Sequence, residues 1–116
     1  MKAVLFNRHS GELIQGGLEL IDVERQGHQW LWLDMDGNEA EKETAILRER
    51  FHINPLAIVD ALRTRHPPKI ETFGEITFLL LRGLSADTTN IRYQTIQIAL
   101  FIGKDFLVTR HSNVSL

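Results

Sequence analysis

The sequence predicts an α+β fold in which a mixed sheet of about six or seven strands carries two consecutive helices on one face. Three observations support this prediction: β-rich segments in the first third of the chain, two adjacent segments with helical spacing, and β-rich segments again in the second half. The 116 residues, 43% of them hydrophobic, suffice for one packed core. We therefore expect a single domain over residues 1–116.

Three strands are predicted in the N-terminal third. Segments 2–6 and 18–24 are rich in strand-forming residues, and the Gly16-Gly17 pair between them suits a turn. Segment His28–Met35 places tryptophans on one face and leucines on the other, which is typical of a strand covered on both sides. We expect this last strand to lie near the centre of the sheet.

The stretch DMDGNEAEKETAILRERF is acidic enough to suggest a site for a hard cation. A calcium loop counted from Asp34 needs a glycine at its sixth position and a glutamate at its twelfth, but here the glycine is fourth and the twelfth residue is Ala45. A helix explains the stretch better, with Asn38 as its N-cap and Glu41 three residues later. Its predicted buried stripe consists of Ala40, Thr44, Leu47 and Phe51.

A second helix is predicted in NPLAIVDALRTRHPPKIE, with Asn54 as its N-cap and Pro55 at its first position. Its predicted buried side consists of Leu56, Ile58, Val59 and Leu62. Asp60 lies off that side, and we expect it to be at least partly exposed, with a surface ion pair to Arg63 as the simplest interpretation. Pro67-Pro68 end the helix or the loop that follows it.

The second half of the chain is predicted to be mostly sheet. A strand runs from about Ile76 to Leu84, a polar loop covers Ser85–Asn90, and residues 93–111 form a hairpin that turns through Gly103–Asp105. Several of these strands are apolar on both faces, and two short helices can cover only one face. We therefore expect an oligomer partner, or helices beyond Leu116, on the second face.

Composition excludes several functional classes. With 13 Lys and Arg residues against 15 Asp and Glu residues and a pI near 6.2, no basic face for nucleic acid is expected. The chain has no cysteine, no pair of histidines at helical spacing, no glycine-rich phosphate loop and no nucleophile motif, so we do not expect an enzyme. The longest uninterrupted apolar run, Ile98–Ile102, is too short to span a membrane, and we expect the chain as given to be soluble.

Four segments resemble, in order and spacing, the cytoplasmic N-terminal domain of the CorA family of divalent-cation transporters. They are WLD at Trp32–Asp34, ILRERFHINPLAIVDAL, PPKIETFGEITFLLLRGL and TIQIALFIGKDFLVTRH. The resemblance covers about Trp32 to His111. It implies an α/β/α sandwich, followed in the family by a long helix and two transmembrane helices that this chain lacks. It also implies a Mg²⁺/Co²⁺ transporter on the cytoplasmic side of the cell inner membrane, assembled as a pentamer of identical protomers.

The same resemblance implies a role for Asp60. In the family, an acid at this place helps to bind a regulatory Mg²⁺ between neighbouring protomers, and loss of the ion at low cytosolic Mg²⁺ loosens the assembly toward an open pore. The partner acid belongs to the long helix that is missing here, so the isolated domain should bind Mg²⁺ weakly. Co²⁺, Zn²⁺ and Ni²⁺ are the alternative ions. The family's His-Pro is Asn54-Pro55 here, its acid before the sensor is Val59, and its Arg-Pro-Lys is Pro67-Pro68-Lys69.

Two alternatives to the Mg²⁺/Co²⁺ transporter domain remain open. The first is the corresponding domain of a ZntB-like Zn²⁺ transporter, because the ion is selected in the membrane part. The second is a free-standing α/β module that binds a small ligand, which would need a pocket with converging polar groups.

Overall fold

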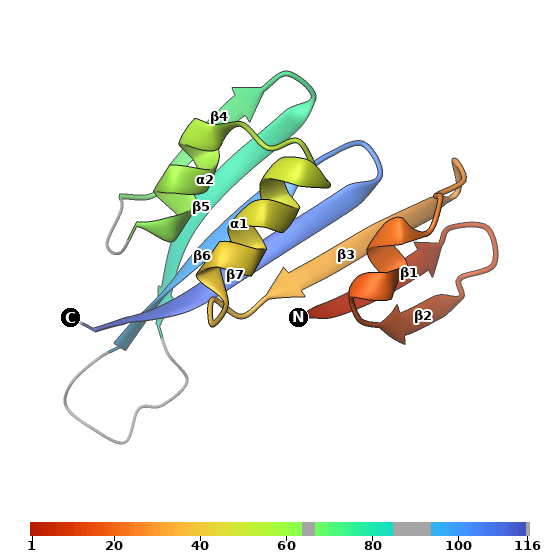
Figure 1. Cartoon of the computed structure of the whole chain (residues 1–116), viewed down its shortest axis with the longest axis horizontal. Helices are drawn as coiled ribbons and strands as arrows, with labels where there is room; N and C mark the ends of the chain where they lie inside the picture. Colours follow the sequence, from red (N-terminus) through yellow and green to blue (C-terminus); the bar gives the residue numbers. More distant parts are fainter. Residues whose placement is uncertain (64–66, 85–93, 116) are drawn as a thin grey trace.

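The computed structural model describes residues 1–63, 67–84 and 94–115, which form one mixed seven-stranded sheet with helices on one face (Figure 1). The strands are β1 (Lys2–Asn7), β2 (Leu13–Gly16), β3 (Gln29–Met35), β4 (Lys69–Phe73), β5 (Ile76–Leu84), β6 (Gln94–Ile102) and β7 (Phe106–Ser115). The helical elements are the 3₁₀ helix η1 (Leu18–Asp22) and the α-helices α1 (Ala40–Glu49) and α2 (Pro55–Leu62). The predicted fold class is confirmed. The predicted polar loop Ser85–Asn90 lies outside the described residues.

The order of the strands is β2-β1-β3-β7-β6-β5-β4. Neighbouring strands are antiparallel except for β3 and β7, which pair in parallel with Leu31 opposite Phe106 and Leu33 opposite Val108. Strand β7 therefore joins an N-terminal half of the sheet to a C-terminal half. Strand β3 lies inside the sheet, as its sequence predicted.

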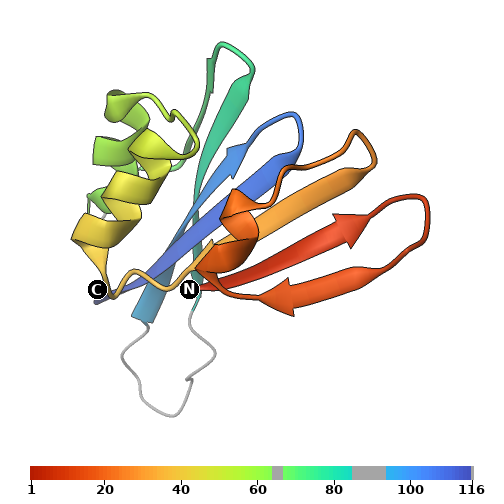
Figure 2. The same ribbon diagram turned by 45° about the vertical axis from the view of Figure 1, so that its right-hand side comes forward.

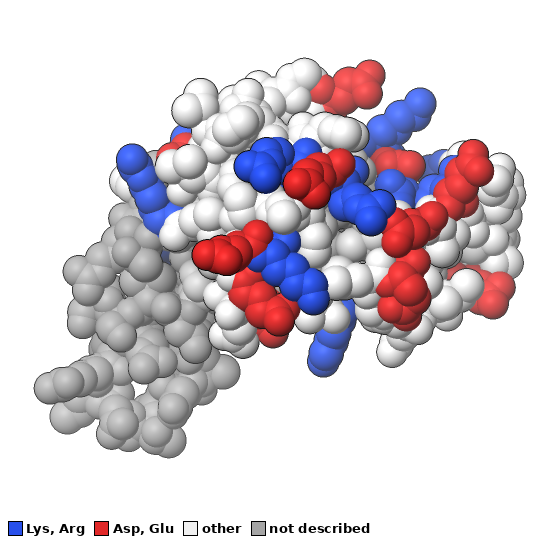
Figure 3. Space-filling model, in the orientation of Figure 1, with Lys and Arg blue, Asp and Glu red and all other residues white. Residues whose placement is uncertain are grey.

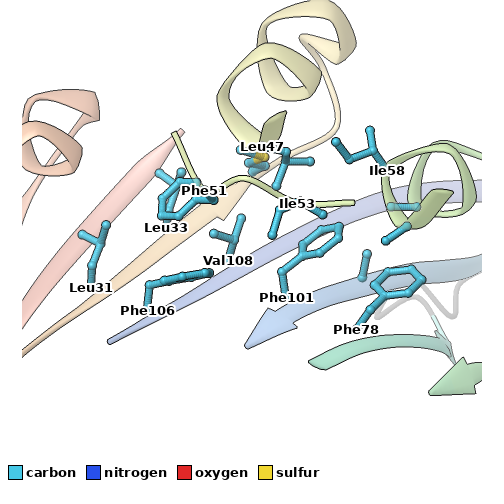
Figure 4. Close-up of a cluster of buried hydrophobic side chains, with 14 of the residues drawn as sticks. Leu31, Leu33, Leu47, Phe51, Ile53, Ile58, Phe78, Phe101, Phe106 and Val108 are labelled. Atoms are coloured by element: carbon cyan, nitrogen blue, oxygen red, sulfur yellow. The ribbon is translucent and has the colours of Figure 1, made fainter. Parts of the chain in front are cut away.

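Both α-helices lie on one side of the sheet (Figure 2), and the hydrophobic core lies between them and the strands. Alternate residues of the strands face the helices, and Leu47 from α1 and Ile58 from α2 pack onto them (Figure 4). The sheet contributes Phe78 and Phe101, which stack with their ring centroids 5.1 Å apart. This single cluster extends across β1, β3, β5, β6 and β7 and positions both helices.

The predicted strand over residues 18–24 is wrong. The partner of β1 in the N-terminal hairpin is the earlier strand β2, and residues Leu18–Asp22 form η1 instead. The N–H of Gly17 donates to the Glu19 carboxylate over 2.9 Å at the start of this turn. The turn buries Leu20 in the core.

Helix α1 begins later than predicted. Its N-cap position is Glu39, without a side-chain cap, whereas the N–H of Asn38 donates to Asp36 Oδ1 over 3.0 Å. Of the predicted stripe, Leu47 and Phe51 are buried but Ala40 is exposed. The buried residue of the first turn is Glu43, which has a charged partner on the sheet.

Helix α2 has the predicted cap but turns a different face to the core. Asn54 Oδ1 accepts a hydrogen bond from the N–H of Leu56 over 2.9 Å, and Pro55 follows at the first position. The predicted buried side is wrong in part, because Leu56 is 68% and Val59 50% exposed. The residues that face the sheet are Ala57, Ile58 and Ala61. The small side chains of Ala57 and Ala61 allow this side of α2 to lie close to the strands, and it is therefore the buried side.

The second face of the sheet carries many apolar side chains but no helix of the described ranges. Trp32 is 45% and Leu81 44% exposed on this face. An apolar hollow of about 300 Å³ is lined by Val4, Phe6, Leu13, Trp30, Trp32 and Leu107. This surface, which we call the open sheet face, fits the prediction that a further element covers it. Within the described ranges, each helix is too short or too polar to cross a bilayer.

Candidate functional site

Asp60 lies in the second half of α2, turned toward strand β4. Its side chain is 18% exposed, so the prediction that Asp60 is at least partly exposed is confirmed. The ammonium group of Lys69 forms an ion pair with Asp60 Oδ2. Arg63, the predicted partner, is an exposed residue that follows the last turn of α2. The structure therefore pairs Asp60 with Lys69 of the next element along the chain, beyond the end of α2.

Lys69 holds two carboxylates at once, because its ammonium also contacts Glu71 Oε1. Lys69 and Glu71 are two residues apart on β4, so their side chains emerge on the same side of the strand. Their partners on the neighbouring strand β5, Leu80 and Phe78, are buried beneath the helices. This side of β4 therefore faces α2. The sequence patterns described above did not predict β4 or this trio. The signal was present in KIE, where a lysine and a glutamate alternate with an apolar residue.

The trio is partly shielded from water. The exposed fractions of the side chains are 26% for Lys69, 18% for Asp60 and 40% for Glu71. The Lys69 ammonium also lies 5.8 Å from the centre of the Phe78 ring, within range of a cation–π interaction. The hydrogen bonds to Asp60 and Glu71 raise the pKa of Lys69 above its ordinary value. Lys69 is therefore firmly protonated at neutral pH.

The donor chemistry at Asp60 suits Mg²⁺ only in part. Carboxylate oxygens are the ligands that Mg²⁺ prefers, and this ion is often held by one or two of them. In the described part of the chain, however, no group of three or more His, Asp or Glu side chains is arranged to hold a metal. The Asp60 and Glu71 carboxylates already face a lysine. These residues could offer a divalent cation at most part of its ligands, and only in competition with Lys69.

The acidic stretch that begins at Asp34 is occupied by internal contacts. Asp34 Oδ1 accepts a hydrogen bond from the Thr109 hydroxyl over 2.7 Å, and Asp34 Oδ2 lies 3.3 Å from the His111 ring nitrogen Nε2. The N–H of Asn38 donates to Asp36, and this hydrogen bond lowers the pKa of Asp36. Glu43 bonds to Arg110 and to the N–H of Gly37. These contacts are structural, but they differ from the predicted capping: Asp34 and Glu43 contact residues of β7, and no side chain caps the start of α1.

The outer side of α2 is apolar. Leu56 and Val59 are one helical turn apart and exposed, next to Asp60 in sequence. Figure 3 shows mostly uncharged side chains over α2, beside the charged side chains of α1. Val59 stands where the family resemblance places a second acid, so this surface is less charged and more apolar than the resemblance implied. Exposed apolar residues that cluster in this way are typical of contact surfaces.

A second cavity, unlike the apolar hollow on the open sheet face, is lined by charged as well as aromatic side chains. A cavity of about 740 Å³ at the end of the sheet near the β6–β7 turn is lined by Phe6, Arg8, Arg25, Gln26, Gly27, Gln29, Trp30, Lys104 and Asp105. Arg8 is held in place by a hydrogen bond from Nη2 to the carbonyl of Gly27 over 2.9 Å. Arg25 Nε lies at ion-pair distance from Asp105, 3.1 Å, yet this buried nitrogen makes no well-aligned hydrogen bond within the described residues. Three cations and one acid thus surround a hollow with aromatic walls.

Comparisons with known proteins give one consistent result. The sequence profile of the CorA-like Mg²⁺ transporter proteins matches residues 27–115. The chain is 35% identical over 89 residues to "Putative metal ion transporter YfjQ" of Bacillus subtilis (strain 168), covering 77% of this chain and 26% of that protein. It is 25% identical over 114 residues to "Putative metal ion transporter C17A12.14" of Schizosaccharomyces pombe, covering 97% of this chain and 18% of that protein. The chain thus spans about a quarter or less of these relatives.

Solved structures share the fold. The soluble domain of CorA from Methanocaldococcus jannaschii superposes with a TM-score of 0.68 at 13% identity, over 96% of this chain and 40% of that one. The full-length CmaX protein gives a TM-score of 0.72 at 16% identity, over 96% of this chain and 34% of that one. At these identities, the likeness concerns the fold alone.

Proposed function

Because the chain belongs to the family of CorA-like Mg²⁺ transporter proteins, we propose that it is the regulatory and assembly domain of a metal ion transporter. The observation that carries the proposal is the open sheet face, where Trp32 on β3 and Leu81 on β5 lie nearly half exposed, each on a strand that has a neighbour on both sides. An apolar surface of this kind is expected to be covered. We propose that it packs against helices of a longer transporter chain, which leads on to the membrane.

The sequence of the source gene beyond the codon for Leu116 tests this part of the proposal. A long amphipathic helix followed by two apolar spans is the expected result, because such helices would complete the third layer and anchor the domain to the inner face of the membrane. A stop codon soon after Leu116 would contradict the proposal.

The second part of the proposal concerns assembly. In this view, identical protomers, five in the complete transporter, meet along the outer side of α2 through Leu56 and Val59. Asp60 lies beside this surface and would hold a regulatory Mg²⁺ together with an acid of the neighbouring protomer. The bound ion would supply the positive charge that lets two carboxylates approach each other. Mg²⁺ and Co²⁺ are the proposed cargo, and Zn²⁺ is the alternative that fits a ZntB-like member.

The test of this part uses the full-length protein in membranes. In Asp60→Asn, Mg²⁺ should no longer protect the domain from limited proteolysis, whereas the wild-type domain becomes resistant as Mg²⁺ is raised. The matched control is Asp22→Asn, which removes an exposed acid that pairs with Arg50 over 2.5 Å, far along the chain from α2. Equal protection of Asp60→Asn and wild type would rule out the regulatory role of Asp60.

The cavity near the β6–β7 turn favours a second candidate function, the binding of a small organic anion. Its volume is in the range of ligand pockets, and Arg8, Arg25 and Lys104 offer positive charge beside the flat side chains of Phe6 and Trp30. Fluorescence of Trp30 in a titration with nucleoside triphosphates would detect such binding, since a base that stacks on the indole quenches it. Binding that Arg25→Gln abolishes and Arg48→Gln leaves intact supports this candidate. The absence of quenching at millimolar ligand rejects it.

A further inference from the structure

Residues of three elements, α2, β4 and β5, surround the ammonium group of Lys69. Lys69 opens β4 on the side of the strand that faces α2, where Asp60 is the acid of the facing helix and Glu71 the acid of its own strand. Its side chain also lies over Phe78 of β5. The ammonium is therefore placed by the sheet and the helix together, and it does not depend on a chance encounter of long surface side chains.

We infer that Lys69 is the built-in counter-cation of the Asp60 site. Its ammonium lies between the Asp60 and Glu71 carboxylates, where a divalent cation would otherwise bind, so cation binding by Asp60 requires Lys69 to leave. This inference rests on the proposed function in one respect, namely that Asp60 is a cation ligand.

Charge balance explains why Lys69 holds this place. With all three side chains at most 40% exposed, two carboxylates without a cation would repel each other in a partly dehydrated setting. Lys69 removes this repulsion, and because it is part of the same chain, it does so at a high effective concentration. A dissolved ion must first displace it.

The consequence is a threshold for the cation. A ligand that binds only the minor conformation, in which Lys69 has moved away, has its apparent affinity reduced by the population of that conformation. Because residue 59 is a valine, it adds no carboxylate that would favour binding of the divalent ion over binding of the Lys69 ammonium. Asp60 would therefore respond only at high cation concentration, or when a neighbouring protomer contributes another acid. In this view, Lys69 sets the concentration at which the domain senses the ion.

The test is a Mg²⁺ titration of the 116-residue chain, followed by amide chemical shifts in α2 and β4. In Lys69→Met, which keeps the length of the side chain but not its charge, the affinity should rise about tenfold or more. The control is Lys42→Met, which removes an exposed lysine paired with Glu39 at 4.0 Å, and it should leave the titration unchanged. Adding Asp60→Asn to Lys69→Met should abolish the gain. A folded Lys69→Met chain with wild-type affinity would overturn the inference.

A second measurement does not depend on the folding of that variant. In the wild-type chain, the Nζ resonance of Lys69 should shift as Mg²⁺ saturates the site, because the ammonium loses its carboxylates. Changes at Asp60 without any change at Lys69 would overturn the inference. The two proposals can fail separately. A gain of affinity in Lys69→Met with an Asp60→Asn transporter that still responds to Mg²⁺ would support the counter-cation and reject the regulatory function. Wild-type affinity in Lys69→Met, together with an Asp60→Asn transporter that no longer responds to Mg²⁺, would reject the counter-cation and support the regulatory function.

Discussion

Arg110 of β7 and Glu43 of α1 form a buried ion pair, with Arg110 Nε 3.0 Å from Glu43 Oε1. Both groups have further partners: Glu43 Oε2 accepts from the N–H of Gly37, and Arg110 Nη1 donates to the carbonyl of Ala61 over 3.1 Å. The pair thus ties the loop after β3, both α-helices and the central strand together. The Glu43 side chain is fully buried and that of Arg110 is 7% exposed.

Removal of the negative charge from this pair should destabilise the fold strongly. Glu43→Gln leaves Arg110 as a buried charge without its counter-ion, and such a change costs about 3–5 kcal/mol. Because domains of this size have a total stability of about 5–15 kcal/mol, a large part of the fold's stability would be lost. Urea denaturation measures the loss. Glu41→Gln, on an exposed position of the same helix, should change the free energy of unfolding by less than about 0.5 kcal/mol.

The outer side of α2 should tolerate polar residues that its inner side does not. Val59→Ser changes an exposed position, so the free energy of unfolding should stay within about 0.5 kcal/mol of wild type. Ile58→Ser, the buried neighbour, should cost about 2–5 kcal/mol because it empties part of the core. Thermal denaturation of the two variants compares them directly. If Val59→Ser were as harmful as Ile58→Ser, the described orientation of α2 would be wrong.

Two glycines with positive φ should respond differently to alanine. Gly37 has φ of 79°, and an added Cβ would lie 2.6 Å from the carbonyl oxygen of His111. Gly11 has a similar φ of 74° but open space around it. Gly11→Ala should therefore cost only the left-handed backbone conformation, about 1–2 kcal/mol. Gly37→Ala adds a clash with main chain and should cost clearly more. Equal losses in chemical denaturation would show that the backbone at Gly37 can move aside.

The Lys69 contacts predict how stability changes at alkaline pH. Since the folded state raises the pKa of Lys69, its ion pairs stabilise the protein fully below the unfolded pKa, which is about 10.4. This stabilisation is lost as the pH rises through the higher pKa of the folded state. The difference in urea midpoint between wild type and Lys69→Met should therefore be constant from neutral pH to about pH 9 and shrink above about pH 10.4. A difference that stays constant to pH 12 would contradict the assignment.

Local signals in the sequence predicted much of the fold. The strand over Ile76–Leu84, the hairpin predicted over residues 93–111 and the Asn54 cap of α2 follow from alternation, turn residues and capping chemistry, which act over a few residues. The prediction of a strand over residues 18–24 was wrong because a 3₁₀ turn and a strand can bury the same short apolar run. Only contact with the core distinguishes them.

The candidate site could be predicted only in part. Asp60 was singled out by resemblance, but its partner Lys69 depends on how α2 rotates on the sheet. That rotation is set by the small side chains of Ala57 and Ala61, whereas a hydrophobic-stripe argument favours the larger Leu56 and Val59. Glu43 was likewise missed, because an acid at a buried helix position is expected only once the facing Arg110 is known.

The place of β7 in the sheet has a consequence for the order of events during synthesis. The strand that lies between β3 and β6 is the last of the seven to be translated. Until it has left the ribosome, β2-β1-β3 and β6-β5-β4 have no strand to join them, and Phe106 and Val108 are missing from the core. The nascent chain therefore exposes two unfinished sheet edges, which invite pairing with other chains. Rapid insertion of β7 is then a safeguard against aggregation as well as the step that joins the two halves of the sheet.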